Sequence, residues 1–311
     1  MKTVKAVAPY IHPEFLNFKT AAYEAWERCG GKTAESHYPI RMLHGLAFRY
    51  EIPTLWKSNQ EVHLRFIEPV SVSFDTFPDY ALYEIIPFVW DCWPCYFEKM
   101  CRWLQKHQVK TAIFSSSQTA KRMRERFPKM NIMYCSEAVD KTIYHEGKLL
   151  TERKIDILEF GRGSGLNVYT NGHGNINYVC TKVNGEFVFN NEQLYAAMSD
   201  AKTTIALPRS ITQPEIAGDI ETLTQRYWEN MLSRIVMVGH APKELTDLIG
   251  FNPVVEIDTA HSSEQIAHIL QHITDYQPLV DKNRETALQM GDWTIRMHQV
   301  MAWLKDCGYE I

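Results

Sequence analysis

The chain has 311 residues, a length that allows two domains of ordinary size. Hydrophobic residues make up 45% and charged residues 23%, a balance that excludes an intrinsically disordered protein and indicates a large buried core. The formal net charge of −4 excludes a general affinity for nucleic acid, so no nucleic-acid partner is expected.

Targeting and redox signals favour the cytoplasm. A proline and a histidine interrupt the short apolar stretch of the N-terminus, which therefore does not resemble a secretory signal. The longest apolar region, Tyr80–Trp93, contains Glu84, Pro87 and Asp91 and is not expected to span a membrane. The 7 cysteines are irregularly spaced, as is typical of reduced thiols. We therefore expect a cytoplasmic protein.

Short apolar runs alternate with amphipathic stretches along the first half of the chain. The expected strands are Lys2–Ala8, Val70–Phe74, Ile85–Trp90 and Thr111–Ser115. The expected helices are Phe15–Cys29, Tyr96–His107 and Gln118–Arg126. Strands that alternate with helices predict a parallel sheet covered on both faces.

The same pattern restarts after the polar stretch Asp140–Lys154. The expected strands are now Ile155–Phe160, Tyr178–Thr181, Thr203–Leu207, Arg234–Val238 and Val254–Ile257. The expected helices are Glu192–Asp200, Thr222–Leu232, Lys243–Ile249, Ser263–Thr274 and a long last helix, Leu279–Leu304.

We therefore predict an α/β fold with two Rossmann-like domains facing a cleft. Their expected bounds are 1–140 and 155–282, with a linker at 141–154 and a C-terminal helix, 283–311, that packs across the domain junction. The apolar side of this helix leaves peripheral membrane contact open, and the oligomeric state is open as well. Ligands of such sheets bind beyond the carboxyl ends of the strands, so the residues just after each strand are the candidates for the site.

Two glutamates in the second half, Glu221 and Glu229, lie eight positions apart. On one helix they would differ by about 80° in direction and about 12 Å in height. Carboxylates accept hydrogen bonds from vicinal sugar hydroxyls, and a helix N-terminus suits a diphosphate. The alternative is a solvated helix face that carries two glutamates by chance.

The surrounding segment, ETLTQRYWENMLSRIVMVGHAP, resembles the Glu-x7-Glu region of retaining GT-B glycosyltransferases, of the group 1 or spore-protein-like type. Three other segments resemble family landmarks in the same order: TAIFSSSQTAKRM, MYCSEAVDKTIY and IDILEFGR. The resemblance implies the GT-B fold and metal-independent transfer of a sugar from a nucleoside-diphosphate sugar to an acceptor hydroxyl, with retention. It implies no cofactor beyond this co-substrate, and it leaves the acceptor open, with polysaccharide among the candidates.

By this resemblance Glu229 holds the donor ribose and Glu221 acts at the donor sugar. Arg162 and Arg209, each just after a strand, would neutralise the diphosphate. Arg226 is a further donor candidate, or it pairs with a neighbouring carboxylate.

The chain also departs from the family pattern. Thr222 and Thr224 stand where the family has glycines, and their hydroxyls would contact the donor instead. The lysine expected after the Gly161-Arg162 pair is missing. A nucleotide- or sugar-binding protein of the GT-B kind without turnover is therefore the alternative function.

Three residues that follow strands complete the candidates. Asp91 would act as a catalytic base or orient the acceptor, or else cap the helix that begins near Pro94. His12 and His240 would face the cleft, or else are ordinary structural histidines.

Two competing chemistries follow from short motifs. Cys92 and Cys95, in a Cys-x-x-Cys between a strand and a helix, have the local form of a thiol oxidoreductase. Gly161–Gly165 partly matches a dinucleotide fingerprint, but Leu166 replaces its third glycine. No His/Cys/Asp cluster has the spacing of a metal site.

Overall fold

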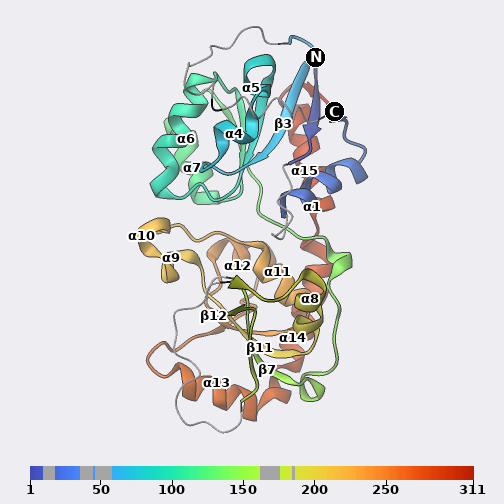
Figure 1. Ribbon diagram of the computed structural model, residues 1–311, viewed down its shortest axis with the longest axis vertical. Coiled ribbons are helices and arrows are strands. Elements are labelled where there is room, and N and C mark those ends of the chain that lie inside the picture. The colour runs from blue at the N-terminus through green and yellow to red at the C-terminus, as the bar shows by residue number, and fades with distance from the viewer. Residues whose placement is uncertain (10–17, 36–44, 46–57, 162–175, 184–185) are drawn as a thin grey trace. The chain divides into compact units, whose positions relative to one another are not determined.

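The structure, a computed structural model, describes residues 1–9, 18–35, 45, 58–161, 176–183 and 186–311 (Figure 1). The chain divides into two compact units. Unit 1 consists of Met1–Glu137, Glu215–Thr222 and Trp293–Ile311, and unit 2 of Ala138–Pro214 and Leu223–Asp292. The expected linker 141–154 thus falls within unit 2, and the expected C-terminal segment 283–311 is divided between the units. That this segment packs across a domain junction stays a prediction.

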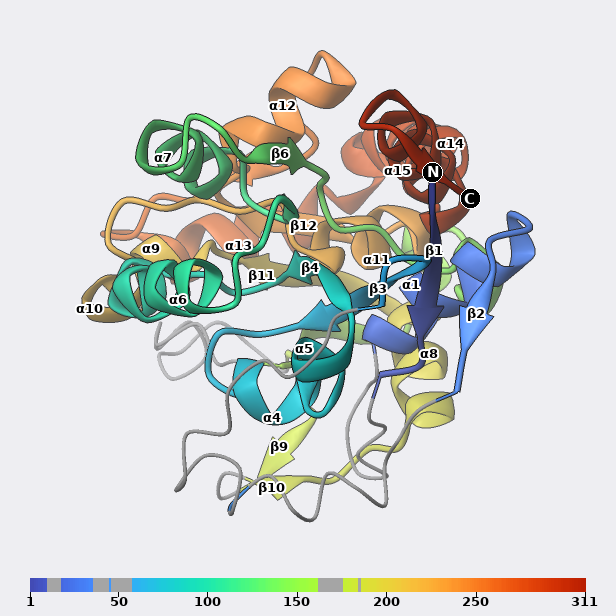
Figure 2. The same cartoon turned by 90° about the horizontal axis from the view of Figure 1, so that it is seen from above.

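Unit 1 is built on a parallel sheet with the order β14-β1-β3-β4-β5-β6, in which β2 also pairs with β1. Figure 2 shows β1, β3 and β4 following one another. The bounds are β1 Lys2–Val7, β2 Thr33–Ala34, β3 Glu61–Ile67, β4 Glu84–Val89, β5 Thr111–Phe114, β6 Asn131–Tyr134 and β14 Tyr309–Glu310. All residues of β4 and β5 are buried, as expected of parallel strands with both faces covered.

The helices of unit 1 cover this sheet. They are α1 Phe18–Arg28, α4 Val72–Thr76, α5 Asp79–Leu82, α6 Pro94–Lys106, α7 Ser117–Arg126 and α15 Trp293–Asp306, together with most of α10, Pro214–Ala217. The helix predicted at Tyr96–His107 is α6, and its side chains Met100, Cys101 and Leu104 are buried. α1 packs against α15, so the C-terminal helix completes the first unit (Figure 1).

The expected strands do not include β2, β3, β6 and β14, of which β3 is the longest, and one predicted strand is wrong. β3 contains His63 and Arg65, which alternate with apolar residues and so indicate a solvated face. Both side chains are buried instead, because Asp79 lies 3.1 Å from His63 Nδ1 and accepts a hydrogen bond from Arg65 at 3.0 Å. The segment Val70–Phe74, predicted as a strand, contributes to α4, in which Val72 and Thr76 face the core four residues apart.

Unit 2 has its own parallel sheet, with the order β13-β12-β11-β7-β8. The strands are β7 Ile155–Glu159, β8 Tyr178–Cys180, β11 Ala201–Ala206, β12 Val236–Gly239 and β13 Val255–Glu256, and a small antiparallel pair is formed by β9 Lys182–Val183 and β10 Glu186–Phe187. The chain proceeds from β7 to β8 on one side and then returns to β11 on the other. The carboxyl ends of β7 and β11 therefore form the topological switch point, where open α/β sheets bind ligands.

The helices of unit 2 agree with most predicted bounds. They are α8 Asn191–Ser199, α9 Arg209–Thr212, α11 Gln225–Leu232, α12 Lys243–Ile249, α13 Ser262–Gln271 and α14 Gln277–Met290, with short 3-10 turns at Lys141–Ile143, Leu150–Glu152 and Ile273–Tyr276. None of the described helices is both long and apolar enough to cross a membrane.

The long last helix that the sequence predicted is in fact two helices, α14 and α15. The break falls at Gly291 and Asp292. A Cβ on Gly291 would lie only 2.8 Å from the Trp228 ring, so glycine allows this close approach. The Asp292 side chain accepts a hydrogen bond from the Lys141 amide at 3.3 Å. The Asp292 backbone forms a β-bridge with Val139, so this residue is not part of a helix.

The segment 141–154 is fastened to unit 2 by one buried arginine. Arg153 donates to the carbonyls of Glu146 and Lys148 within the segment, each at 3.0 Å. It also donates to the carbonyls of Ala201 at 2.8 Å and Ser233 at 3.0 Å, at the start of β11 and the end of α11. A segment that looks like a polar linker in the sequence is thus part of the folded unit.

Candidate functional site

The described candidates for nucleotide binding lie on or beside the carboxyl ends of the unit 2 strands. α11 carries Arg226 and Glu229, and Thr224 is its N-cap residue, without a side-chain cap hydrogen bond. Because α11 begins at Gln225, Glu221 precedes the helix, and the predicted placement of both glutamates on one helix is wrong. The boundary between the two units falls between Thr222 and Leu223, so Glu221 belongs to unit 1 and Glu229 belongs to unit 2.

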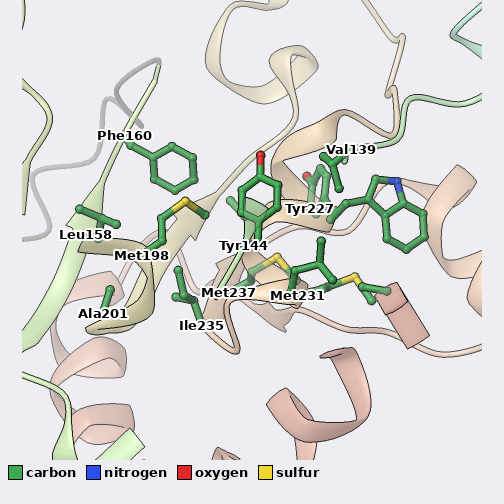
Figure 3. Close-up of a cluster of buried hydrophobic side chains, with 14 of the residues drawn as sticks. Val139, Tyr144, Leu158, Phe160, Met198, Ala201, Tyr227, Met231, Ile235 and Met237 are labelled. Atoms are coloured by element: carbon green, nitrogen blue, oxygen red, sulfur yellow. The ribbon is translucent and has the colours of Figure 1, made fainter. Parts of the chain in front are cut away.

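Glu229 is a buried carboxylate, with 5% of its surface exposed. Its Oε1 accepts a hydrogen bond from the Tyr144 hydroxyl at 2.8 Å. Burial raises the pKa of Glu229 above its ordinary value, although the Tyr144 hydrogen bond and the Arg226 charge act in the opposite direction. Tyr144 belongs to a cluster of buried apolar side chains that also includes Phe160 and Tyr227 (Figure 3). The carboxylate is therefore held at the edge of the core rather than on a solvated helix face.

Arg226 lies against the carboxyl end of β7. Its guanidinium carbon is 5.4 Å from the centroid of the Phe160 ring, a cation–π contact. Gly161 has a φ of +73°, a backbone conformation that favours glycine, and a Cβ there would lie 2.3 Å from Arg226 Nη2. Burial lowers the pKa of Arg226, while the Glu229 carboxylate opposes this effect. A partly buried cation thus lies at one strand of the switch point.

Arg209 and His240 follow the next two strands of the same sheet. Arg209 is the first residue of α9, directly beyond β11, and its Nε donates to Gln213 Oε1 at 2.9 Å. His240 follows β12, and its Nδ1 lies 2.6 Å from Glu256 Oε1. The His240 carbonyl accepts from the Tyr227 hydroxyl of α11 at 2.7 Å. The His240 ring is thus engaged by a carboxylate.

In unit 1, Asp91 follows β4 and adopts a left-handed backbone conformation, with φ of 50°. Such backbone conformations are uncommon outside glycine and recur at functional sites. The N-cap residue of α6 is Trp93, and not Asp91. Asp91 instead lines a pocket at the carboxyl ends of β4 and β5. The other lining residues are Val89, Cys92, Trp93, Phe114, Ser115, Ser116, Thr119, Ile220 and Thr222.

Glu221 lies at the end of a segment, Glu215–Thr222, that is seated on unit 1. Gln118 of α7 holds the backbone of this segment. Its side chain accepts a hydrogen bond from the Glu221 amide at 2.8 Å and donates one to the Asp219 carbonyl at 2.9 Å. Arg122 pairs with the Asp219 carboxylate at 2.7 Å. The apolar side chains of the segment, with Ile220 among them, pack on Trp93. Two predicted residues, Glu221 and Thr222, are thereby placed beside unit 1 residues.

Sequence reasoning missed Tyr144 and Gln118, which bond to Glu229 and to the Glu221 amide. Both lie in segments that resembled family landmarks, but no local pattern distinguishes them from their neighbours. Two predicted residues, His12 and Arg162, lie outside the described residues. The described residues also bring together no group of three His, Cys, Asp or Glu side chains that could hold a metal ion. Metal-independence itself stays a prediction.

The Cys-x-x-Cys motif does not have the features of a redox dithiol. Cys92 is buried and Cys95 is exposed, and both are free thiols. Burial raises the pKa of Cys92 far above the ordinary value of a thiol, whereas a reactive first cysteine needs a lowered pKa.

We expect iodoacetamide at pH 8 to alkylate Cys95 roughly 100-fold faster than Cys92 in the folded protein, because only the thiolate reacts. Peptide mass mapping over time measures both rates, and the Cys95→Ser variant is the control that removes the fast site. Equal rates, or a Cys92–Cys95 disulfide formed in air, would restore the oxidoreductase alternative.

Two units, each with a wholly parallel sheet flanked by helices, define the GT-B class of fold, as predicted. No protein-family model matches the sequence, and no curated protein matches it. Among solved structures, the chain is similar to AviGT4, a glycosyltransferase involved in avilamycin A biosynthesis. The TM-score is 0.55 at 11% identity, over 98% of each chain. It is also similar to TarM, with a TM-score of 0.53 at 9% identity. That likeness covers 85% of this chain and 58% of TarM, so the chain spans little more than half of TarM. At these identities the likeness concerns the fold.

Proposed function

We propose that the protein is a glycosyltransferase that moves a sugar from a nucleoside-diphosphate sugar to an acceptor hydroxyl, with retention and without a metal ion. The observation that carries the proposal is the pair of cationic side chains at the switch point of unit 2, Arg226 beyond β7 and Arg209 beyond β11. Guanidinium groups suit phosphate oxygens and stabilise the charge of a departing diphosphate. The fold shared with a solved glycosyltransferase supports the same proposal.

The proposed roles follow from the contacts of each side chain. Glu229 accepts hydrogen bonds from the ribose hydroxyls, oriented by the Tyr144 hydroxyl that already holds one of its oxygens. Arg226, held over Phe160 and stabilised in its charged form by the Glu229 carboxylate, contacts the diphosphate. Glu221 acts at the donor sugar. The remaining donor candidates, Thr222, Thr224 and Arg162, stay predictions. So do the cleft candidates His12 and His240 and the cytoplasmic localisation.

The test is a thermal-shift screen of the protein against uridine, guanosine, adenosine and thymidine diphosphates and their hexose conjugates. We expect one base to raise Tm. In titration calorimetry with that nucleotide, Arg209→Met should weaken binding about 10–100-fold, because it removes a charged hydrogen-bond donor. Arg122→Met is the matched control, since Arg122 belongs to unit 1 and pairs with Asp219.

Turnover is measured as release of the nucleoside diphosphate, and the anomeric configuration of the product by NMR. If no nucleotide binds, the proposal fails. Binding without any sugar transfer would instead identify the protein as a nucleotide- or sugar-binding protein of the same fold.

A further inference from the structure

The solvent side of α13 carries two histidines that the candidate site does not use. His268 and His272 lie four positions apart and are both exposed, whereas Ile266 and Ile269 of the same helix are buried in the core of unit 2. Positions four apart lie on one face of a helix, and the two ring centroids are only 4.2 Å apart, with 36° between the ring planes. Two histidines at this spacing on a helix are able to bind one metal ion together.

One hydrogen bond fixes the position of the proton on the His272 ring. Nδ1 of His272 lies 2.9 Å from the backbone carbonyl of His268. A carbonyl oxygen can only accept, so Nδ1 carries the hydrogen, and Nε2 of the neutral ring keeps its lone pair. Histidines that bind metals usually donate their other ring N–H to a carbonyl or carboxylate in this way. The His272 ring therefore already has the tautomer of an Nε2 metal ligand.

The charges around the pair favour a cation. His272 is the C-cap residue of α13, and the C-terminus of a helix is the negative end of its dipole. The surrounding sequence, residues 244–281, contains no lysine or arginine and 7 carboxylate residues, Glu244, Asp247, Glu256, Asp258, Glu264, Asp275 and Asp281. Two of these residues, Glu264 and Asp275, precede His268 by four positions and follow His272 by three, and both are exposed. The local potential therefore attracts a positive ion and repels an anion.

The pair lies away from the proposed nucleotide site of the same unit. The 3-10 turn that follows α13, Ile273–Tyr276, packs against the turn Leu150–Glu152, which precedes β7. The Leu150 amide also donates to the Gln277 side chain at 2.9 Å. The end of α13 is thus at the amino ends of the strands, whereas the nucleotide candidates are at the carboxyl ends. A metal ion bound here takes no part in the proposed transfer, so this inference is independent of the proposed function.

We propose that His268 and His272 form a surface site for a divalent cation that prefers imidazole ligands, such as Ni²⁺ or Zn²⁺. Nε2 of His272 is one ligand, and the His268 ring supplies the other. Water fills the remaining positions, because the described residues bring no third His, Cys, Asp or Glu side chain to the pair. Mg²⁺ is not bound, since it prefers oxygen ligands. The sequence-based expectation of no metal site did not include this His-x3-His pair.

The test is titration calorimetry of the full chain with NiCl₂, ZnCl₂ and MgCl₂, in a Cys95→Ser background that removes the exposed thiol. We expect Ni²⁺ and Zn²⁺ to bind and Mg²⁺ to give no signal. His268→Ala and His272→Ala should each weaken Ni²⁺ binding at least about 10-fold. The double variant should be no weaker than either single variant, because the loss of one imidazole already ends chelation. His145→Ala, an exposed histidine outside α13, is the matched control and should bind like the background protein.

A second measurement checks the geometry without any metal. In ¹⁵N NMR of the histidine side chains, the neutral His272 ring should carry its proton on Nδ1, as the bond to the His268 carbonyl requires. An Nε2–H tautomer, background affinity in either single variant, or an equal loss of affinity in His145→Ala would each overturn the proposal. A circular-dichroism melt confirms that each variant is folded. Nucleotide binding, measured in the same samples, should not change, so the failure of one proposal leaves the other standing.

Discussion

Replacement of Glu229 by glutamine is expected to leave the protein at least as stable as wild type at pH 7.5, while nucleotide binding falls about 10–100-fold. A glutamine at this position would keep the shape of the side chain and still accept the Tyr144 hydrogen bond through its amide oxygen. Burial raises the pKa of the Glu229 carboxyl group, so its ionisation at pH 7.5 costs free energy in the folded protein. Glutamine does not ionise, and the variant is free of this cost. The ribose, however, loses a charged acceptor, worth about 1.5–3 kcal/mol.

The pH dependence of this effect has a definite sign. The folded-state pKa of Glu229 is raised, so the stabilising contribution of its proton is complete below the unfolded value of 4.5. That contribution is lost as the pH rises through the folded-state pKa. Wild type and Glu229→Gln should therefore unfold alike at pH 4, and the variant should become the more stable protein as the pH increases.

Thermal melts between pH 4 and 8, with Glu192→Gln as an exposed control on α8, measure this difference. Each kcal/mol moves Tm by about 2–4 °C in a domain of this size. A variant that is less stable than wild type at pH 7.5 would show that the carboxylate holds the fold. A variant with wild-type nucleotide affinity would remove Glu229 from the proposed site.

The sequence predicted best those elements whose apolar pattern is local. α6, α7, α12 and β7 have the expected periodicities, and their bounds agree within about two residues. The helix that carries Glu229 was also predicted, but it begins three residues later than expected. The segment just before the helix is held within unit 1, where the Glu221 amide donates to Gln118 at 2.8 Å. Contacts of this kind connect positions more than a hundred residues apart, and no local pattern encodes them.

The errors have the same origin. β3 was missed because its polar residues His63 and Arg65 are buried beside Asp79, which pairs with Arg65 and precedes β4 in the chain. The break between α14 and α15 was missed because the contact of Gly291 with Trp228 exists only in the folded unit. For the candidate site, the sequence predicted the residue types at the strand ends, such as Asp91 and Arg209. It did not predict that the Tyr144 hydroxyl bonds to Glu229, because the two residues are 85 positions apart in the chain.

Arg153→Met is expected to destabilise unit 2 by about 3–5 kcal/mol, because several buried carbonyls lose their hydrogen-bond donor, at about 1–3 kcal/mol for each group left unsatisfied. The guanidinium holds four backbone carbonyls from three separate parts of the unit, and methionine fills similar volume without any donor. Burial lowers the pKa of Arg153 to about 10, which leaves it protonated at neutral pH. The loss of stability should therefore be the same at pH 6 and pH 8.

The expected decrease in Tm for Arg153→Met is about 10 °C. Lys154→Met, an exposed neighbour, is the matched control and should melt like wild type. Hydrogen exchange adds the decisive readout, because the Arg153 contacts connect the 141–154 segment to the start of β11. Exchange should accelerate in both of these regions and in the residues after α11, while the amides of β4 in unit 1 stay protected. If only residues 141–154 exchange faster and Tm is unchanged, the segment is a separable linker, as the sequence alone had predicted, and the site residue Tyr144 within it would not be held by the fold of unit 2.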